Sequence, residues 1–369
     1  MLINFKPNYT ITDEILSLLM EAESIKQRVH LLPMNLSVIN SLRETAKLFT
    51  THYSTFIEGN RLNVKEVKQV VEKKGHFPGR ERDEKEIIGY YYALKFVEDS
   101  VTEDSVLNED LIKKIHAHVI SFGVKKKLKP TPYREAQNII KDSSSGKIAY
   151  LPPEACDVPG LMADLVEWTL AHFECKPVPL IAAIIHYQFV TIHPYFDGNG
   201  RTARLLTNYI LYKGGYDLKG LYSLEEYYAK NLRVYYEAIS VGPSHNYYMG
   251  RAESDITKWI VFFLRGLVHS FKKVEAQMEL SSLKDHPDHS IALRSLDPKQ
   301  RKVLMLFEKN EFIRSKQLCS LFDIKSRTAS GLCKKWVDSG FLKIKDSALK
   351  SRTYELSQKY SVLLSFNQN

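Results

Sequence analysis

The chain has 369 residues, of which 44% are hydrophobic and 26% charged, and its formal net charge is +9. This length exceeds one typical domain, and the hydrophobic content excludes a largely disordered chain. The absence of an apolar run of about 18 residues or more argues against a transmembrane helix, and the N-terminus lacks a signal-peptide pattern. Because the four cysteines form no close pair, we expect reduced thiols, no zinc site and a cytoplasmic protein.

Apolar residues recur at helical spacing along most of the chain, so the predicted fold class is mainly α. A β-hairpin is predicted where two short apolar runs, residues 138–140 and 148–151, flank a serine-rich loop. In chain order, the expected helices cover residues 12–20, 40–49, 84–96, 108–119, 157–172, 180–190, 205–211, 224–239 and 255–275.

The C-terminal part differs from the rest in the order of its elements. Residues 281–298 are rich in Ser, Asp, Pro and His and indicate a connector. Beyond it we expect three helices followed by two short strands, which is the order of a winged helix-turn-helix. The helices are expected at residues 299–307, 315–322 and 326–339, and the strands at 342–344 and 353–356.

The whole positive excess belongs to this C-terminal module. Residues 299–369 contain 15 Lys and Arg against 6 Asp and Glu, whereas the first 298 residues contain 37 of each. Such a surface suits DNA phosphates, and an equally weighted alternative is a protein-interaction or dimerisation module with a solvated basic face. The basic residues at the third helix and in the hairpin are Lys325, Arg327, Lys334, Lys335, Lys345, Lys350 and Arg352.

The most informative segment is residues 193–204, HPYFDGNGRTAR, which lies between two helical patterns. A helix N-terminus carries unpaired N–H groups and partial positive charge, and glycines let the backbone approach a ligand, which together make a phosphate cradle. Arg201 and Arg204 lie on one helix face and suit a polyphosphate. Asp197 offers an oxygen ligand for Mg²⁺. His193 is a candidate base near neutral pH.

This segment resembles the Fic family signature, His-Pro-Phe-x-(Asp/Glu)-Gly-Asn-Gly-Arg-x-x-Arg, and departs from it only at Tyr195, where the family usually has Phe. The resemblance implies a Fic-fold helical bundle with a small β-hairpin flap. It also implies transfer of AMP from ATP to a hydroxyl side chain of a target protein, or of the enzyme itself.

The resemblance assigns roles to the residues of the motif. His193 would take the proton of the attacking hydroxyl, and Asp197 would hold Mg²⁺ against the phosphates. Gly200 stands where a kinase-like relative carries lysine, which favours AMP transfer over phosphate transfer. The residues expected to bind ATP are Gly198, Asn199, Gly200, Arg201 and Arg204.

A second pattern, Ser54-x-x-x-Glu58-Gly59, resembles the inhibitory motif of Fic proteins, (Ser/Thr)-x-x-x-Glu-(Gly/Asn). In that family the glutamate pairs with the second arginine of the signature, here Arg204. A carboxylate on Arg204 would occupy the position that the γ-phosphate of ATP needs. The resemblance therefore implies that Glu58 inhibits the isolated protein.

Three further assignments rest on the resemblance. The hairpin of residues 138–151 is similar to the flap that holds the target by strand addition, with Ile140 and Tyr150 as clamps, although a packed surface hairpin explains these residues equally well. Tyr236 corresponds to an adenine-side tyrosine. The histidines His52, His116, His118 and His186 are expected to be structural.

We therefore expect an N-terminal helical region with the inhibitory motif at residues 1–95, a Fic catalytic core at 96–280, a linker at 281–298 and a winged helix at 299–369. The leading function is AMP transfer to a target protein, by a homodimer. The alternatives are removal of AMP, with Glu58 aligning a water, and a DNA-binding regulator whose Fic domain senses nucleotide. His193 argues against a purely binding role, because binding phosphate needs no base.

Overall fold

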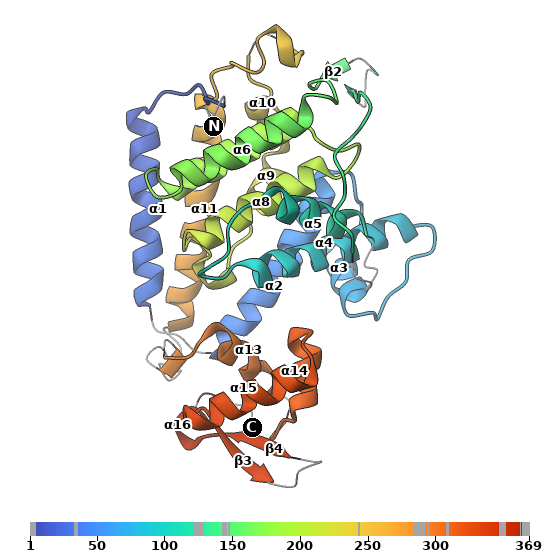
Figure 1. Cartoon of the computed structure of the whole chain (residues 1–369). Coiled ribbons are helices and arrows are strands. Elements are labelled where there is room, and N and C mark those ends of the chain that lie inside the picture. The colour runs from blue at the N-terminus through green and yellow to red at the C-terminus, as the bar shows by residue number, and fades with distance from the viewer. Residues whose placement is uncertain are drawn as a thin grey trace. The chain divides into compact units, whose positions relative to one another are not determined.

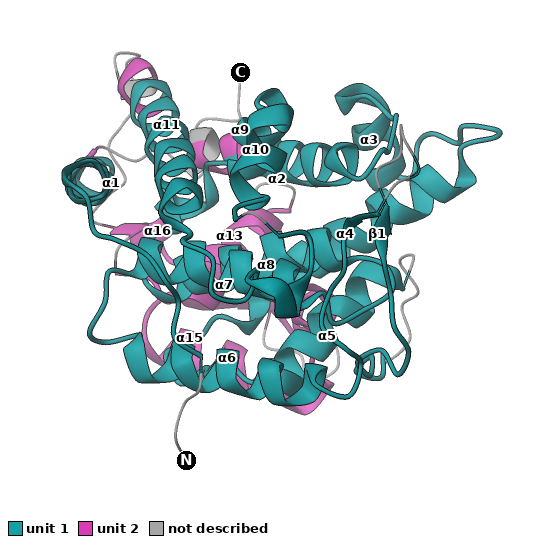
Figure 2. Ribbon diagram, turned by 90° about the horizontal axis from the view of Figure 1, so that it is seen from above, with its two compact units in different colours: residues 1–31, 43–277 teal, residues 32–42, 278–369 magenta. Residues whose placement is uncertain are grey.

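The computed structural model describes residues 5–32, 36–121, 128–141, 146, 148–242, 244–282, 292–293, 295–307, 310–346, 352–361 and 363 (Figure 1). The chain divides into two compact units. The first comprises Met1–Leu31 and Arg43–Gln277, and the second comprises Leu32–Leu42 and Met278–Asn369 (Figure 2). In the described part of the chain, no helix has the length and apolar character that crossing a membrane would require.

Among the described residues of the first unit, the named elements are helices and one small antiparallel hairpin, which agrees with the predicted mainly α fold. The hairpin pairs β1 (Ile140–Lys141) with β2 (Ile148–Tyr150), with Ile140 opposite Tyr150. The helices that lie wholly or mostly in this unit are α1 (Asp13–Leu31), α2 (Leu36–Ile57), α3 (Val64–Val71), α4 (Glu81–Ser100), α5 (Glu109–Ile120), α6 (Val158–His172), α7 (Val178–Ile192), α8 (Asn199–Lys213), α9 (Leu224–Lys230), α10 (Leu232–Ile239) and α11 (Thr257–Ser282).

Helices α7 and α8 form the centre of this unit. Nearly every residue of α7 is buried, as expected of a helix that is apolar all round. Pro179 lies in its first turn, where the missing N–H costs no helical hydrogen bond. Helix α7 packs most extensively against α8, and α5 and α4 also pack on α8. The loop between α7 and α8 is therefore held by two buried helices.

The structure differs from the sequence prediction at three places in the first unit. The single helix predicted at 224–239 is two helices, because Asn231 leaves helical geometry (φ −118°, ψ 37°) and its side chain donates to Tyr227 O at 2.9 Å. Helix α3 was not predicted, although Asn63 and Glu66 form a capping box in front of it. The expected boundary between residues 95 and 96 falls inside α4, and both sides of it belong to the first unit.

The second unit contains the predicted three helices and hairpin in the predicted order. One face of α15, formed by Ala329, Cys333 and Trp336, is buried in this unit. Most of the connector predicted at 281–298 lies outside the described residues. The elements are α13 (Pro298–Phe307), α14 (Ser315–Phe322), α15 (Ser326–Asp338), β3 (Leu342–Asp346), β4 (Thr353–Leu356) and the short α16 (Gln358–Ser361).

Candidate active site

The loop between α7 and α8 begins and ends with left-handed backbone. His193 has φ 52°, and its N–H donates to Phe189 O at 3.0 Å, which closes the last turn of α7. Gly198 has φ 79° and precedes the first residue of α8. A Cβ at Gly198 would lie 3.3 Å from His116 Nε2, so both the dihedral and the space favour glycine. The motif thus forms the predicted interhelical loop.

His193 has one ring nitrogen bound and the other available as a base. Its Nδ1 lies 3.2 Å from Val190 O. A carbonyl only accepts, so this contact places the proton on Nδ1 and the lone pair on Nε2. Burial lowers the pKa of His193 to about 4, and the hydrogen bond to Val190 opposes this only in part. The imidazole is therefore neutral at pH 7 and can accept a proton there.

The loop is supported by His116 and Asn199. His116 Nε2 contacts Asp197 O at 2.8 Å, and its ring stacks on Tyr195 with centroids 3.5 Å apart. Asn199 Oδ1 accepts from Tyr195 N at 3.0 Å, and its Nδ2 donates to Tyr195 O at 2.7 Å. The amide of Asn199, predicted to line the phosphate site, is thus used within the loop, where it fixes the turn.

Arg201 and Asp197 form the exposed side of the site. Arg201 Nη2 lies 2.9 Å from Asp197 Oδ1, which also accepts from Gly198 N at 2.6 Å. The Asp197 side chain is 66% exposed, whereas that of Arg201 is 4% exposed. Within the described part of the chain, Asp197 Oδ2 accepts no hydrogen bond. Asp197 is therefore held at one oxygen and accessible at the other.

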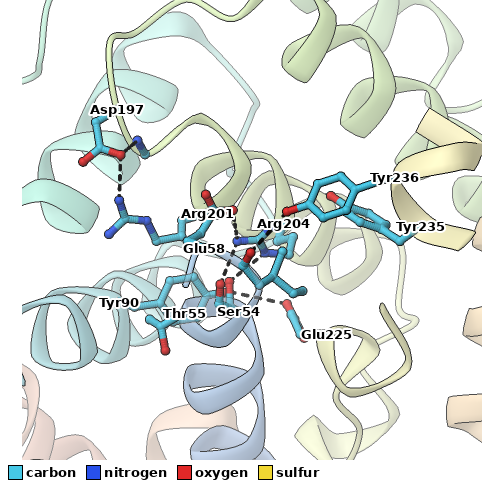
Figure 3. A network of polar contacts seen from close by, with 12 residues as sticks. Ser54, Thr55, Glu58, Tyr90, Asp197, Arg201, Arg204, Glu225, Tyr235 and Tyr236 are labelled. Carbon is cyan, nitrogen blue, oxygen red and sulfur yellow. Dashed lines mark hydrogen bonds and ion pairs between the residues drawn. The ribbon is translucent and has the colours of Figure 1, made fainter. Parts of the chain in front are cut away.

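Arg204 forms the closed side of the site, shown in Figure 3. Its side chain is 1% exposed, and Nη2 lies 2.8 Å from Glu58 Oε1. Nε donates to Ser54 Oγ at 2.7 Å, and Nη2 also donates to Ser54 O at 2.8 Å. Burial alone would lower the pKa of Arg204, but the Glu58 carboxylate raises it well above its usual value. The structure thus brings together the two residues that the inhibitory motif was expected to pair.

The end of α2 determines where Glu58 points. Asn60 N donates to Thr55 O at 3.1 Å and Gly59 N donates to Phe56 O at 2.9 Å, which together form a Schellman motif. Gly59 has φ 96°, a value that glycine adopts readily and asparagine tolerates, which matches the alternatives in the inhibitory motif. A Cβ at Gly200 would lie 2.4 Å from Glu58 Oε1. The Glu58 carboxylate therefore covers the first turn of α8.

Two residues that hold this loop were missed by the sequence analysis. Arg134 is buried. Its backbone N–H donates to Pro194 O at 2.9 Å, and its side-chain Nε donates to His193 O at 3.0 Å. Its Nη2 also binds Pro153 O, beyond the hairpin. Asn138 Nδ2 donates to Tyr195 O at 3.0 Å. Arg134 lies in no periodic or motif pattern, and Asn138 lies at the start of the predicted hairpin, whose pattern gives no indication of this contact.

The residues proposed for the flap and the adenine side lie around the same loop. Tyr150 donates its hydroxyl to Thr191 O at 2.7 Å, near the end of α7, while Ile140 is half-buried opposite it. Tyr236 is 47% exposed and donates to Ile57 O at 3.1 Å, next to Glu58. His186 is fully buried between Thr207 Oγ1 and Tyr235 Oη, which fits a structural role.

A neutral base, an accessible carboxylate and two arginines lie around one helix N-terminus, an arrangement whose chemistry suits phosphate groups. Residues 106–211, which include this loop, match the Fic/DOC family. This part of the chain is therefore similar to the family that the sequence analysis indicated.

Relatives with assigned names share this region. The chain is 34% identical over 169 residues to the protein adenylyltransferase Fic of Nematostella vectensis, covering 45% of this chain and 37% of that protein. It is 33% identical over 194 residues to the protein adenylyltransferase fic-1 of Caenorhabditis briggsae, covering 51% of this chain and 36% of that protein. The chain thus matches little more than a third of the length of these relatives.

Solved structures share the fold. A Fic family protein from Desulfovibrio desulfuricans G20 superposes with a TM-score of 0.60 at 21% identity, covering 96% of this chain and 99% of that one. Fic-1 from C. elegans, residues 134–508, superposes with a TM-score of 0.57 at 21% identity, covering 72% of this chain and 73% of that one. These likenesses confirm the predicted, mainly helical Fic fold.

Proposed function

We propose that the protein transfers AMP from ATP to a hydroxyl side chain of a target protein. The observation that carries this proposal is the neutral His193, with Nε2 free to take a proton, beside the N-terminus of α8 and Arg201. A site that only bound phosphate would not need a base held in this tautomer. The names of the relatives that share residues of this region support the same reaction.

The reaction balances with the residues present. The target hydroxyl attacks the α-phosphorus of ATP, the bond from that phosphorus to the bridging oxygen of the β-phosphate breaks, and pyrophosphate leaves. His193 Nε2 takes the hydroxyl proton. The backbone N–H groups at the start of α8 and the guanidinium of Arg201 stabilise charge on the phosphates. The target residue stays a prediction, and so do self-modification and the homodimer.

The donor set at Asp197 fits Mg²⁺. One accessible carboxylate oxygen is what a magnesium ion takes from a protein when substrate phosphates and water complete its octahedron. When bound, the ion would neutralise charge on the phosphates. Asp197 would hold it, while Arg201 keeps that carboxylate oriented through Oδ1.

We further propose that Glu58 inhibits the reaction in the isolated protein. Its carboxylate binds Arg204 and lies against Gly200, so it covers the place that terminal phosphates would take at this helix N-terminus. Removal of AMP by the same site, with Glu58 aligning a water, is the alternative. The Glu58 side chain is 31% exposed, which gives water access to it.

One experiment tests transfer, inhibition and removal together. Wild type, Glu58→Gly and His193→Ala are incubated with Mg²⁺ and ATP labelled at the α-phosphate, in the presence of cell extract. We expect label on protein with Glu58→Gly, little with wild type and none with His193→Ala. Labelled extract is then returned to wild type, and release of AMP there would favour removal. No labelled protein with any variant, although ATP still binds, would contradict transfer.

For the second unit we propose DNA binding. The buried face of α15 leaves Arg327, Lys334 and Lys335 exposed, with the small residues Ser330 and Gly331 between them. No acidic side chain lies in α15 before Asp338, its last residue. An exposed helix with basic ends and a narrow middle suits the major groove and its flanking phosphates.

Salt dependence tests this proposal. Binding of the full chain to duplex DNA should weaken steeply between about 50 and 200 mM salt, and Lys334→Ala with Lys335→Ala should reduce the slope. Absence of binding at low salt would favour a protein-interaction module instead.

A further inference from the structure

Glu225 is a buried carboxylate that the proposed reaction does not use. It lies in the first turn of α9 and is 2% exposed. Its Oε1 accepts from Asn208 Nδ2 at 3.0 Å and from Tyr90 Oη at 3.4 Å, and its Oε2 accepts from Ser223 Oγ at 3.2 Å. Within the described residues all of these side-chain donors are neutral. A buried carboxylate without a directly bound cation calls for an explanation.

A chain of polar groups connects Glu225 to Arg204, and Figure 3 shows it. Arg204 Nε donates to Ser54 Oγ, the Ser54 side chain neighbours Tyr90, and Tyr90 donates to Glu225. Asn208, one turn after Arg204 on α8, also donates to Glu225. An ionised carboxylate only accepts, so Tyr90 donates to Glu225, and a guanidinium only donates, so the Ser54 hydroxyl oxygen accepts from Arg204.

The charges of Glu225 and Arg204 also act on each other directly. Burial raises the pKa of Glu225, and among the opposing influences is the Arg204 guanidinium. Arg204 therefore has two carboxylates within its electrostatic reach. Glu58 comes from the end of α2 and is partly exposed, whereas Glu225 is fixed inside the bundle.

The difference in exposure between Glu58 and Glu225 matters when Glu58 moves away from Arg204. An isolated buried cation is costly, so Arg204 with no other counter-charge would hold Glu58 tightly and would resist its displacement by ATP. We propose that Glu225 is a positioning residue that acts as a fixed counter-charge to Arg204 and weakens its hold on Glu58. The proposal rests on the proposed role of Glu58 as an inhibitor.

The test measures ATP affinity in two backgrounds. Glu225→Gln is made in wild type and in Glu58→Gly, and the Kd of Mg²⁺-ATP is measured by titration calorimetry. In wild type we expect affinity to fall about three- to ten-fold, because Arg204 holds Glu58 more strongly. In Glu58→Gly we expect affinity to be unchanged or up to about three-fold higher, because Arg204 now attracts only the phosphates.

A merely structural role predicts a different pattern. Damage to the bundle would weaken ATP binding in both backgrounds, and an equal loss in both, or no change in either, would overturn the proposal. Glu225→Asp keeps the charge and should restore the wild-type affinity. Glu226→Gln is the matched control: its carboxylate binds Lys230 and Lys273, and we expect less than two-fold change in Kd.

Two outcomes separate this proposal from those on which it depends. If Glu58→Gly binds ATP but labels no protein, the proposal of AMP transfer is contradicted. The Kd values for Mg²⁺-ATP in the two backgrounds still test the role of Glu225 in that case. If Glu225→Gln does not fold, Arg204→Met in the same chain should restore folding, because it removes the cation that Glu225 compensates. Failure of that double variant to fold would overturn the proposal.

Discussion

Arg201 and Arg204 lie one turn apart on α8, yet their partners differ in origin and in exposure. Arg201 binds Asp197, four residues before it and 66% exposed, so this side of the site is open. Arg204 binds Glu58, 146 residues before it in sequence, and is itself 1% exposed. The open side is built by a local contact that can persist while phosphates bind. The closed side is built by a distant carboxylate, and under the proposed inhibition that carboxylate would have to move, so regulation could act there without altering the base.

The largest expected effect on the rate of AMP transfer comes from removing the proposed general base, His193. His193→Ala should lower AMP transfer by about 10²- to 10⁴-fold, the usual contribution of a positioned general base. ATP affinity should change little in the Glu58→Gly background, because His193 is not placed to hold the phosphates. Labelling rate and Kd are measured side by side, and an equal loss of both would mean that His193 binds ATP instead.

Opening the closed side should give the next largest effect. Glu58→Gly should raise AMP transfer by about 10-fold or more, because a charge-assisted bond to Arg204 no longer competes with the phosphates. Glu58→Gln keeps the size of the side chain without its charge and should give an intermediate gain. The measurement is the initial labelling rate at saturating ATP. Equal rates for all three proteins would contradict the claim that Glu58 inhibits transfer at Arg204.

Removing the carboxylate on the open side should act on the metal. In the Glu58→Gly background, Asp197→Asn should raise the Mg²⁺ concentration needed for half-maximal transfer by about 10-fold, because a neutral amide oxygen binds Mg²⁺ less strongly. The rate is measured across a magnesium titration. An unchanged midpoint would show that Asp197 serves only to orient Arg201.

A smaller effect is expected from substitutions of Gly59, whose left-handed turn at the end of α2 positions the Glu58 side chain. Gly59→Ala places a Cβ at φ 96° and should cost about 1 kcal/mol, which frays the end of α2 and raises basal transfer a few-fold. Gly59→Asn should stay near wild type, because asparagine tolerates left-handed backbone. Thermal unfolding and basal labelling are compared for the two variants, and identical behaviour would show that the turn does not control Glu58.

The smallest effect is a pH dependence. Because burial lowers the pKa of His193 to about 4, the rate of Glu58→Gly should stay nearly constant from pH 8 down to about pH 5 and fall below that. In the unfolded chain this histidine titrates near pH 6.5, so between about pH 6.5 and 4 the unfolded state binds more protons and stability falls with acid. A rate profile with its midpoint near pH 6.5 would contradict the depressed pKa.

Much of the site follows from the sequence alone. The segment 193–204 marks a loop between two helices because glycines, a helical pattern and paired arginines are local features. The hairpin, and the order of elements in the second unit, follow from equally local periodicity and turn residues. The left-handed turn at Gly59 is likewise encoded locally, since few other residues adopt that dihedral.

The tertiary structure decided which distant groups meet. Only the packing of four helices brings Ser54, Tyr90, Arg204 and Glu225 into one chain of polar contacts. Arg134 comes from a segment without periodicity and Asn138 from the start of the predicted hairpin, and the carbonyl groups that they bind reach them only once the loop is folded. Local patterns depend on neighbours a few residues apart. The burial, pairing and pKa of these groups depend instead on long-range packing, which no short pattern encodes.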